Sequence, residues 1–480
     1  MYYSDVDIDA FNKASKYSSL VKADGNLAYK ISVRDHDGNV TDKPVPVRDA
    51  AVKYLRGLVQ SASSYIGKKV DGAVLAVPTY FTAEQRKALV EVCRDAEIPI
   101  LQMISEPAAA ALSYNLDKGA MPANPQDTTV MVVDVGGSST DVSIMAVRGG
   151  LFVVVGTKHL KEVSGDAMDE LLVSHFAEEF KRKTQIDILG DNDRRAIAKL
   201  KQACEITKRT LSSAATAPCS VESLSQGVDF TGSINRIRFN IRTAPLYRVL
   251  VKAIESLMEE CGYTANEIDR VLFVGGAARV PKLQSEVETI FPEGRTEVLS
   301  APEVGELDEL IAEGCAMQAS LITAGRVKID DEGSPELDQG IAAPALSKTV
   351  GLRLAGDLFL PVVLRDTPVP VSRSVTVSVP PGEAVALFSI YEGTPKPAAE
   401  PADDENEEED AGNSDLKEAE HPSVLMSYTP GTLLGEMTMK LPESAANANV
   451  TVEFFVDKQH GLTVTATEVS TKSEAKLKIV

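Results

Sequence analysis

Cysteine, positive charge and long apolar runs are all scarce in this sequence of 480 residues. The five cysteines are scattered, with no Cys-x-x-Cys pair and no matching histidine spacing, so the sequence predicts neither a disulfide framework nor a zinc site. No apolar run approaches the roughly 18 residues needed to span a bilayer, and the first residues show no secretory signal pattern. These absences predict a cytoplasmic protein that does not enter a membrane.

The shortage of lysine and arginine gives the chain a formal net charge of -21. Such a charge argues against direct binding of bare DNA or RNA, so a contact with the ribosome would need a partner or a local basic patch. What the chain does have is apolar content, at 44% of its residues. This content and length predict a globular protein of about two to four domains.

Residues 70–324 alternate β-branched runs with helical stretches, which is typical of an α/β architecture. Strands are predicted at GAVLAV from Gly72, TVMVVDV from Thr129 and RVLFVGG from Arg270. A helix is predicted after Thr82, with Gln85 three residues on as its capping partner. Functional residues are expected where these strands end.

Beyond this region the pattern changes twice. The polar residues 328–340 break every periodicity and predict an interdomain linker, after which the period becomes two, as expected for an antiparallel β domain. One strand face is predicted from Val375, Val377 and Val379, and another from Val450, Val452, Phe454 and Val456. The acidic residues 395–420 predict a disordered insertion, either a solvated loop or a docking site for a basic partner.

The segment VVDVGGSSTDVSI places a turn of glycines and small hydroxyls between two apolar runs. Glycine lets backbone N–H groups approach an anion closely, so Gly136, Gly137, Ser138, Ser139 and Thr140 form a candidate phosphate-binding turn. The carboxylates on either side, Asp134 and Asp141, suit a hydrated magnesium ion. A tight hairpin turn without a ligand is the alternative.

Two further segments extend this hypothesis toward a nucleotide. A helix is predicted with a buried stripe at Leu200, Cys204, Thr207 and Leu211. Glu205, Lys208 and Arg209 are spaced to share a neighbouring face of this helix, which suits a ribose or base but also an ordinary surface ion-pair network. A predicted strand ends at Gly275 and Gly276, with Arg279 placed to stack on an adenine ring, or simply to turn the chain into a helix. The three segments together indicate a nucleotide site.

These segments resemble the nucleotide-binding domain of the 70-kDa heat-shock chaperone family, through AVLAVPTYFTAEQRK from Ala73, VVDVGGSSTDVSI, EEFKRKTQIDI, CEITKRTLSS and VLFVGGAARVPKLQ. From Pro344 on, the chain resembles the family's peptide-binding domain through VSRSVTVSV, IYEG, LLGEMTMKLP and HGLTVTATEVSTK. The implied fold is an actin-like, two-lobed α/β ATPase domain followed by an antiparallel β-sandwich domain. The implied boundaries are a nucleotide-binding domain at 1–325, a linker at 326–343 and a β domain at 344–480.

The resemblance also implies roles for individual residues. It implies that ATP and Mg²⁺ are the ligands, that Asp134 and Asp141 hold the ion through water, and that Glu106 joins them as a catalytic carboxylate. Residues 136–140 fall on the second phosphate loop of the family. The implied adenosine contacts are Glu205, Lys208, Arg209, Gly275, Gly276, Ala277 and Arg279, with Asp308 near the nucleotide.

Several departures from the family pattern bear on activity. The family's first phosphate loop and its catalytic lysine have no counterpart in this sequence, so an N-terminally incomplete ATPase domain and a β domain without a helical lid are expected. Ser138 replaces a glycine that touches the γ-phosphate, which predicts impaired hydrolysis. Ala277 replaces a serine that hydrogen-bonds adenine. The sequence does not settle whether the chain is an enzyme.

With these departures, the chain resembles most closely the atypical fungal members of the ribosome-associated complex. That resemblance implies a stable pair with a zuotin-like J-protein, an indirect contact with the ribosome, and assistance to a second, catalytic chaperone of the same family on nascent polypeptides. The alternative is an ATP-hydrolysing chaperone that acts directly on client peptides, which the retained acids favour. A small-molecule kinase on the same fold disagrees with the resemblance of the C-terminal third.

Overall fold

A computed structural model of the chain describes most of its residues, namely 8–14, 19–23, 25–34, 39–114, 127–190, 193–299, 306–324, 344–380, 384–395, 428–441 and 448–479. The predicted linker, 328–340, lies outside the described residues, and so do residues 396–420 of the predicted acidic insertion. Pro395, at the start of that predicted insertion, is instead the last residue of a strand. None of the described helices is long and apolar enough to cross a membrane.

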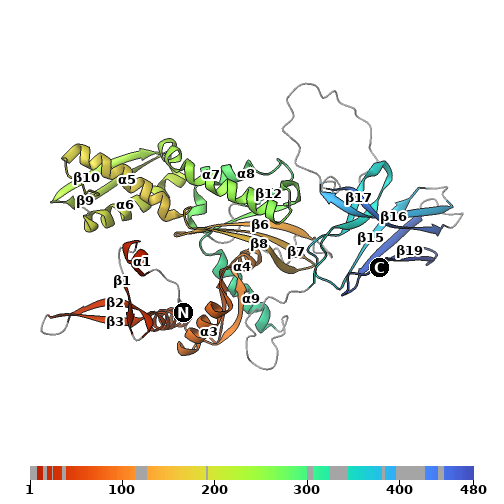
Figure 1. Ribbon diagram of the computed structural model, residues 1–480, viewed down its shortest axis with the longest axis horizontal. Coiled ribbons are helices and arrows are strands. Elements are labelled where there is room, and N and C mark those ends of the chain that lie inside the picture. The colour runs from red at the N-terminus through yellow and green to blue at the C-terminus, as the bar shows by residue number, and fades with distance from the viewer. Residues whose placement is uncertain are drawn as a thin grey trace, which may run out of the picture.

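The N-terminal region is a small meander of strands followed by a long helix (Figure 1). Its antiparallel sheet has the order β1-β2-β3, and the elements are α1 (Ile8–Ala14), β1 (Ser19–Ala23), β2 (Asn26–Arg34), β3 (Val40–Pro46) and α2 (Val47–Ile66). The helix α2 ends at Gly67, whose positive φ of 72° is the left-handed conformation that favours glycine.

A parallel pair of strands forms the next layer, made of β4 (Ala73–Val77), α3 (Ala83–Asp95), β5 (Ile100–Ser105) and α4 (Glu106–Ser113). The predicted strand from Gly72 and the predicted helix after Thr82 are confirmed, including the reciprocal capping bonds between Thr82 and Gln85. The helix α4 packs against α9 (Leu310–Thr323) from the far end of the α/β region. Their contact is so close that a Cβ on Gly314 would lie 1.8 Å from the carbonyl oxygen of Ala109.

The central layer is a five-stranded sheet of order β12-β11-β6-β7-β8. Its strands are β6 (Thr128–Val135), β7 (Thr140–Arg148), β8 (Leu151–Leu160), β11 (Arg270–Val274) and β12 (Glu297–Leu299). The strands β6, β11 and β12 are parallel, whereas β7 and β8 run antiparallel to their neighbours. The predicted strands from Thr129 and Arg270 are confirmed as β6 and β11. The near-continuous burial of β6 and β7 shows that both faces of the sheet are covered there.

Helices and a hairpin complete the α/β region around this sheet (Figure 1). They are α5 (Gly165–Thr184), α6 (Arg194–Ser213), β9 (Thr216–Ser225), β10 (Val228–Asn235), α7 (Arg236–Glu260), the 3-10 turns η1 (Ala265–Glu267) and η2 (Gly276–Arg279), and α8 (Pro281–Glu288). The stripe predicted on α6 is confirmed, because Leu200, Cys204, Thr207 and Leu211 are all buried. One continuous apolar core joins these helices to the sheet.

The C-terminal region is a sandwich of two four-stranded sheets, with orders β14-β13-β16-β17 and β15-β18-β19-β20. The elements are β13 (Val350–Arg353), η3 (Ala355–Asp357), β14 (Phe359–Val363), β15 (Val371–Val379), β16 (Val385–Pro395), β17 (Tyr428–Lys440), β18 (Ala448–Val456), β19 (Leu462–Glu468) and β20 (Glu474–Ile479). The predicted alternation is confirmed on β18, where the four side chains of the predicted face, Val450, Val452, Phe454 and Val456, are at most 1% exposed. An α/β region followed by a β-rich region was therefore predicted correctly.

Polar side chains connect the two regions. Arg148, at the end of β7, is 2% exposed and donates from Nε to the carbonyl of Arg365 at 3.1 Å. Arg365 in turn donates to the carbonyl of Gly262 at 2.6 Å, and its guanidinium lies 3.3 Å from the ring centroid of Tyr263. The Tyr263 hydroxyl then donates to Asp366. This chain of contacts ties the end of α7 to the turn between β14 and β15.

The α4–α9 contact predicts the effect of one methyl group. Gly314→Ala places that group against a backbone carbonyl that cannot move as a side chain can, so we expect a loss of about 2–3 kcal/mol in the free energy of unfolding. Gly57→Ala, in the interior of α2 with open space around it, is the matched control and is expected to stabilise by about 0.5–1 kcal/mol. Thermal unfolding followed by circular dichroism measures both. Equal melting temperatures for the two variants would contradict the close contact.

Candidate functional site

The glycine-containing turn between β6 and β7 is held from two sides. Within it, the N–H of Gly136 donates to the carbonyl of Ser139 at 2.9 Å. From α5, the N–H groups of Gly165 and Asp166 donate to the carbonyls of Gly136 and Gly137, at 3.0 and 2.7 Å. The turn therefore closes a hairpin and leaves its apex, Gly137 and Ser138, exposed. Phosphate binding at this turn stays a prediction.

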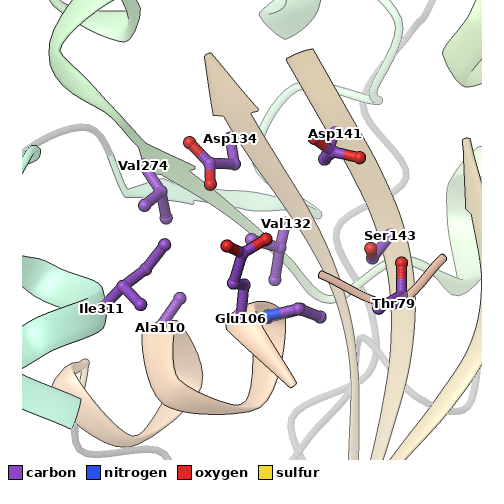
Figure 2. A pocket seen from close by; sticks show the side chains of 10 residues that line it. Thr79, Glu106, Ala110, Val132, Asp134, Asp141, Ser143, Val274 and Ile311 are labelled. Atoms are coloured by element: carbon purple, nitrogen blue, oxygen red, sulfur yellow. The ribbon is translucent and has the colours of Figure 1, made fainter. Parts of the chain in front are cut away.

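Three carboxylates surround one pocket below this turn. Asp134 on β6 and Asp141 on β7 are directly opposite in register, and Glu106 is the first residue of α4. Figure 2 shows Asp134 and Asp141 on neighbouring strands and Glu106 on the helix beside them, and all three line the same pocket. The pocket is lined by Thr79, Glu106, Pro107, Ala110, Val132, Asp134, Asp141, Ser143, Val274 and Ile311. The structure thus brings together the three predicted catalytic residues.

The electrostatics of this pocket follow from packing like charges into a poorly solvated space. Burial raises the pKa of Glu106 to about 7, and the charges of Asp134 and Asp141 add to the shift. Burial likewise raises the pKa of Asp134 to about 6, with a further contribution from Asp141. Within the described residues, neither Glu106 nor Asp134 has an ion-pair partner. A cation placed among the three carboxylates would therefore relieve their repulsion.

Asp141 differs from the other two because it has a partner that the sequence did not reveal. An oxygen of Asp141 lies 2.9 Å from Nδ1 of His159 on β8, and the imidazole packs against the ring of Tyr80 with centroids 4.4 Å apart. Both side chains of the pair are partly buried. Nothing in the sequence spacing indicated His159, because its position depends on the pairing of β7 with β8.

The predicted face of α6 divides in two. Glu205 and Arg209 form an exposed ion pair at 2.8 Å, as a surface network would. Lys208 is buried instead, and its ammonium group lies 2.8 Å from Asp169 and donates to the carbonyl of Gly165 at 2.9 Å. Lys208 therefore stabilises the start of α5, which in turn holds the glycine turn.

The predicted strand end at Gly275 requires glycine for two reasons. Its φ is +87°, and a Cβ there would lie 2.4 Å from the carbonyl oxygen of Val135. The following turn, η2, places Arg279 against Glu306 and Asp308, with 2.6 Å to the latter. Hydrogen bonding from Arg279 lowers the pKa of Asp308, and the charge of Arg209 contributes. Arg279, Asp308 and Arg209 thus lie in one neighbourhood.

The segments predicted to bind nucleotide converge at the start of α5. A Cβ on Gly165 would lie 3.2 Å from Nζ of Lys208, 3.4 Å from Cβ of Ala277 and 3.5 Å from the carbonyl oxygen of Gly136. Thr140 does not join this group with its side chain, since it is fully buried and its hydroxyl donates to the carbonyl of Val163 at 2.8 Å. The side chain of Thr140 thus has a structural role, and its predicted part in ligand binding, which would come from its backbone, stays a prediction.

The donor set fits a nucleotide with a hydrated magnesium ion. Glycines leave the backbone accessible beside carboxylates that repel one another. Such a ligand requires backbone N–H groups for its phosphates and carboxylates for its hydrated metal ion. Among the residues that the structure describes, no group of three or more His, Cys, Asp or Glu side chains is arranged to hold a metal ion directly. An ion held through water by Asp134 and Asp141 remains a prediction.

The fold and this site define a chaperone-type ATPase architecture, and comparison with known proteins places the chain more narrowly. Residues 3–384 match the model described as "Hsp70 protein". The chain therefore belongs to the Hsp70 family, whose members bind ATP, and the predicted family is confirmed.

Its relatives include ribosome-associated chaperones. A heat shock protein 70 homolog of Schizosaccharomyces pombe is 33% identical, across 93% of this chain and 78% of its own. The ribosome-associated complex subunit SSZ1 of Saccharomyces cerevisiae is 33% identical, across 97% of this chain and 84% of its own. A ribosome-associated molecular chaperone of Eremothecium gossypii is 32% identical, across 90% of this chain and 64% of its own.

The raised pKa of Glu106 makes a prediction about stability and pH. Between about pH 4.5 and pH 7, Glu106 binds more protons in the folded state than in the unfolded state. The contribution of this carboxyl therefore lowers the free energy of unfolding as the pH rises through that window. Glu106→Gln cannot ionise and is expected to be more stable than the parent by about 1 kcal/mol at pH 8, after allowance for solvent screening, and equal to it below pH 4.5. Thermal melts across this range measure the difference.

The matched control is Glu474→Gln, which changes an exposed carboxylate of the β region. It is expected to leave the pH profile of stability unchanged. A Glu106→Gln profile parallel to that of the parent would show that the carboxylate is not destabilised in the folded protein.

Proposed function

We propose that this chain is an atypical, ATP-binding chaperone or co-chaperone of a ribosome-associated complex, which pairs with a J-protein and hydrolyses ATP slowly or not at all. The observation that carries the proposal is Ser138, an exposed side chain at the apex of a turn held by α5. Support for the setting comes from the similarity along 97% of the chain to a ribosome-associated complex subunit.

The residues of the site suggest how ATP is held. The turn residues Gly137 and Ser138 offer backbone N–H groups to phosphates, while the N–H of Gly136 closes the turn on the carbonyl of Ser139. The adenosine is predicted to bind near the group of Arg279, Arg209 and Asp308. When bound, Mg-ATP supplies the positive charge of a hydrated metal ion beside the carboxylates. Asp134 and Asp141 would hold such an ion through its water ligands, and its charge would lower their mutual repulsion.

One feature of the chain disfavours rapid hydrolysis. The Ser138 side chain occupies space at the turn where backbone contact with the terminal phosphate is expected. A nucleotide that is bound but rarely cleaved serves as a structural ligand.

The division of labour follows the predicted boundaries. We assign nucleotide binding to residues 1–325, a connection to residues 326–343 and contact with a polypeptide partner to the β region, 344–480. A zuotin-like J-protein is the proposed stable partner, and a second, catalytic chaperone of the same family and nascent polypeptides are the proposed indirect ones. With a net charge of -21, the contact with the ribosome is assigned to the partner, in the cytoplasm.

A second candidate function is an ATP-hydrolysing chaperone that acts directly on client peptides. The specific observation in its favour is that Glu106, Asp134 and Asp141 are all present and face one pocket. Such a cluster, once neutralised by a metal ion, is able to position water for attack.

A single-turnover assay with labelled ATP separates the two. We expect bound ATP with little released phosphate for the parent chain, and a several-fold faster release for Ser138→Gly, because the side chain at the apex is removed. The control is Lys458→Gly, a substitution in an exposed turn of the β region, which is expected to change neither binding nor release. Rapid release by the parent would favour the second function, and a chain that fails to bind ATP would exclude both.

A further inference from the structure

Three ionisable side chains form a row across neighbouring strands of the central sheet. Asp134 on β6 is opposite Asp141 on β7, and Asp141 is opposite His159 on β8. Residues directly opposite on one face lie close enough for their side chains to interact. The 2.9 Å separation between Asp141 and Nδ1 of His159 shows that this pair does so.

A β-bulge creates the pairing. Near the Gly149–Gly150 turn, Arg148 is opposite Leu151. If this register continued unchanged along both strands, Lys158 would be opposite Asp141. The register shifts by one residue between Ile144 and Met145, so His159 takes that place instead. Because side chains alternate between the faces of a strand, the extra residue turns the imidazole toward the carboxylates.

Contacts from the opposite side of the pocket hold the imidazole in place. Tyr80 follows β4 and packs its ring against His159 at 4.4 Å between centroids, tilted by 47°. The neighbouring Thr79 hydrogen-bonds Thr157 of β8 at 3.0 Å, which joins the two segments just beside the pair. The imidazole is therefore packed on one side and hydrogen-bonded on the other.

The pair has a chemical consequence for a metal ion. A carboxylate only accepts hydrogen bonds, so the imidazole must be the donor, and that bond occupies one oxygen of Asp141. A hydrated magnesium ion would compete for that oxygen through its water ligands. In the part of the chain that the structure describes, Asp141 is the one carboxylate of the cluster with such a partner.

We propose that His159 is a positioning residue that withholds one oxygen of Asp141 from the hydration shell of the nucleotide's magnesium ion, so that Asp141 engages that shell only partly, and that it thereby slows turnover. The inference rests on the proposed function, because it assumes that the pocket binds Mg-ATP. It gives slow hydrolysis a second cause, separate from the side chain of Ser138. His159 affects the water around the metal ion, whereas Ser138 affects the phosphate.

The experiment compares variants that lose or keep the hydrogen bond. His159→Ala and His159→Val cannot donate, and valine also suits a strand. Both are expected to release phosphate about tenfold faster in single turnover and to need several-fold less Mg²⁺ for half-maximal ATP binding. His159→Gln keeps a donor and is expected to stay near the parent in both measurements. Lys158→Ala, on the same strand but paired with Glu260, is the matched control.

The Mg²⁺ titration distinguishes this role from a purely structural one, because a loosened fold would not lower the Mg²⁺ requirement. If ATP binds and the alanine and valine variants keep the parent's Mg²⁺ dependence and turnover, the inference is overturned and the proposed function stands. Slower turnover in both variants also overturns it. If neither the parent nor any variant binds ATP, the proposed function itself fails, and the inference fails with it.

Discussion

Mutual repulsion among three carboxylates is the constraint on which the site depends. Glu106, Asp134 and Asp141 come from two layers of the fold and meet in one poorly solvated pocket, where burial and neighbouring charge raise the pKa values of the first two. Such a cluster lowers the free energy of unfolding of the protein without a ligand, and a bound cation would offset this loss. The surrounding elements, from the closely packed α4 to the turn held by α5, hold these groups in place despite their repulsion.

Local pattern was enough to predict much of this arrangement. The Thr82–Gln85 capping box, the alternation on β18 and the buried stripe of α6 all depend on residues a few positions apart, and each is confirmed. The placement of Asp134 and Asp141 across from each other also follows locally, since a short glycine turn joins their strands. Family resemblance added Glu106, which no local pattern connects to the turn.

Other features depend on tertiary contacts that spacing does not carry. Helical periodicity put Lys208 beside Glu205 and Arg209, but Asp169 and the start of α5 draw its ammonium group inward. Thr140 belongs to a polar run, yet its hydroxyl turns to Val163. The bulge in β8 is the clearest case, because counting from the Gly149–Gly150 turn gives Lys158 as the neighbour of Asp141 and misses His159 by one residue.

The strand β7 carries Asp141 at its beginning and Arg148 at its end, so one uninterrupted segment links the carboxylate pocket to the contact with Arg365 of the β region. At about 3.3 Å per residue these two side chains lie roughly 20 Å apart on a single piece of backbone. Adding or removing one residue between them would turn one of the two to the wrong face of the sheet. The number of residues in β7 is therefore fixed by these two contacts. An insertion or deletion is compatible with both contacts only if it falls in the loops outside the strand.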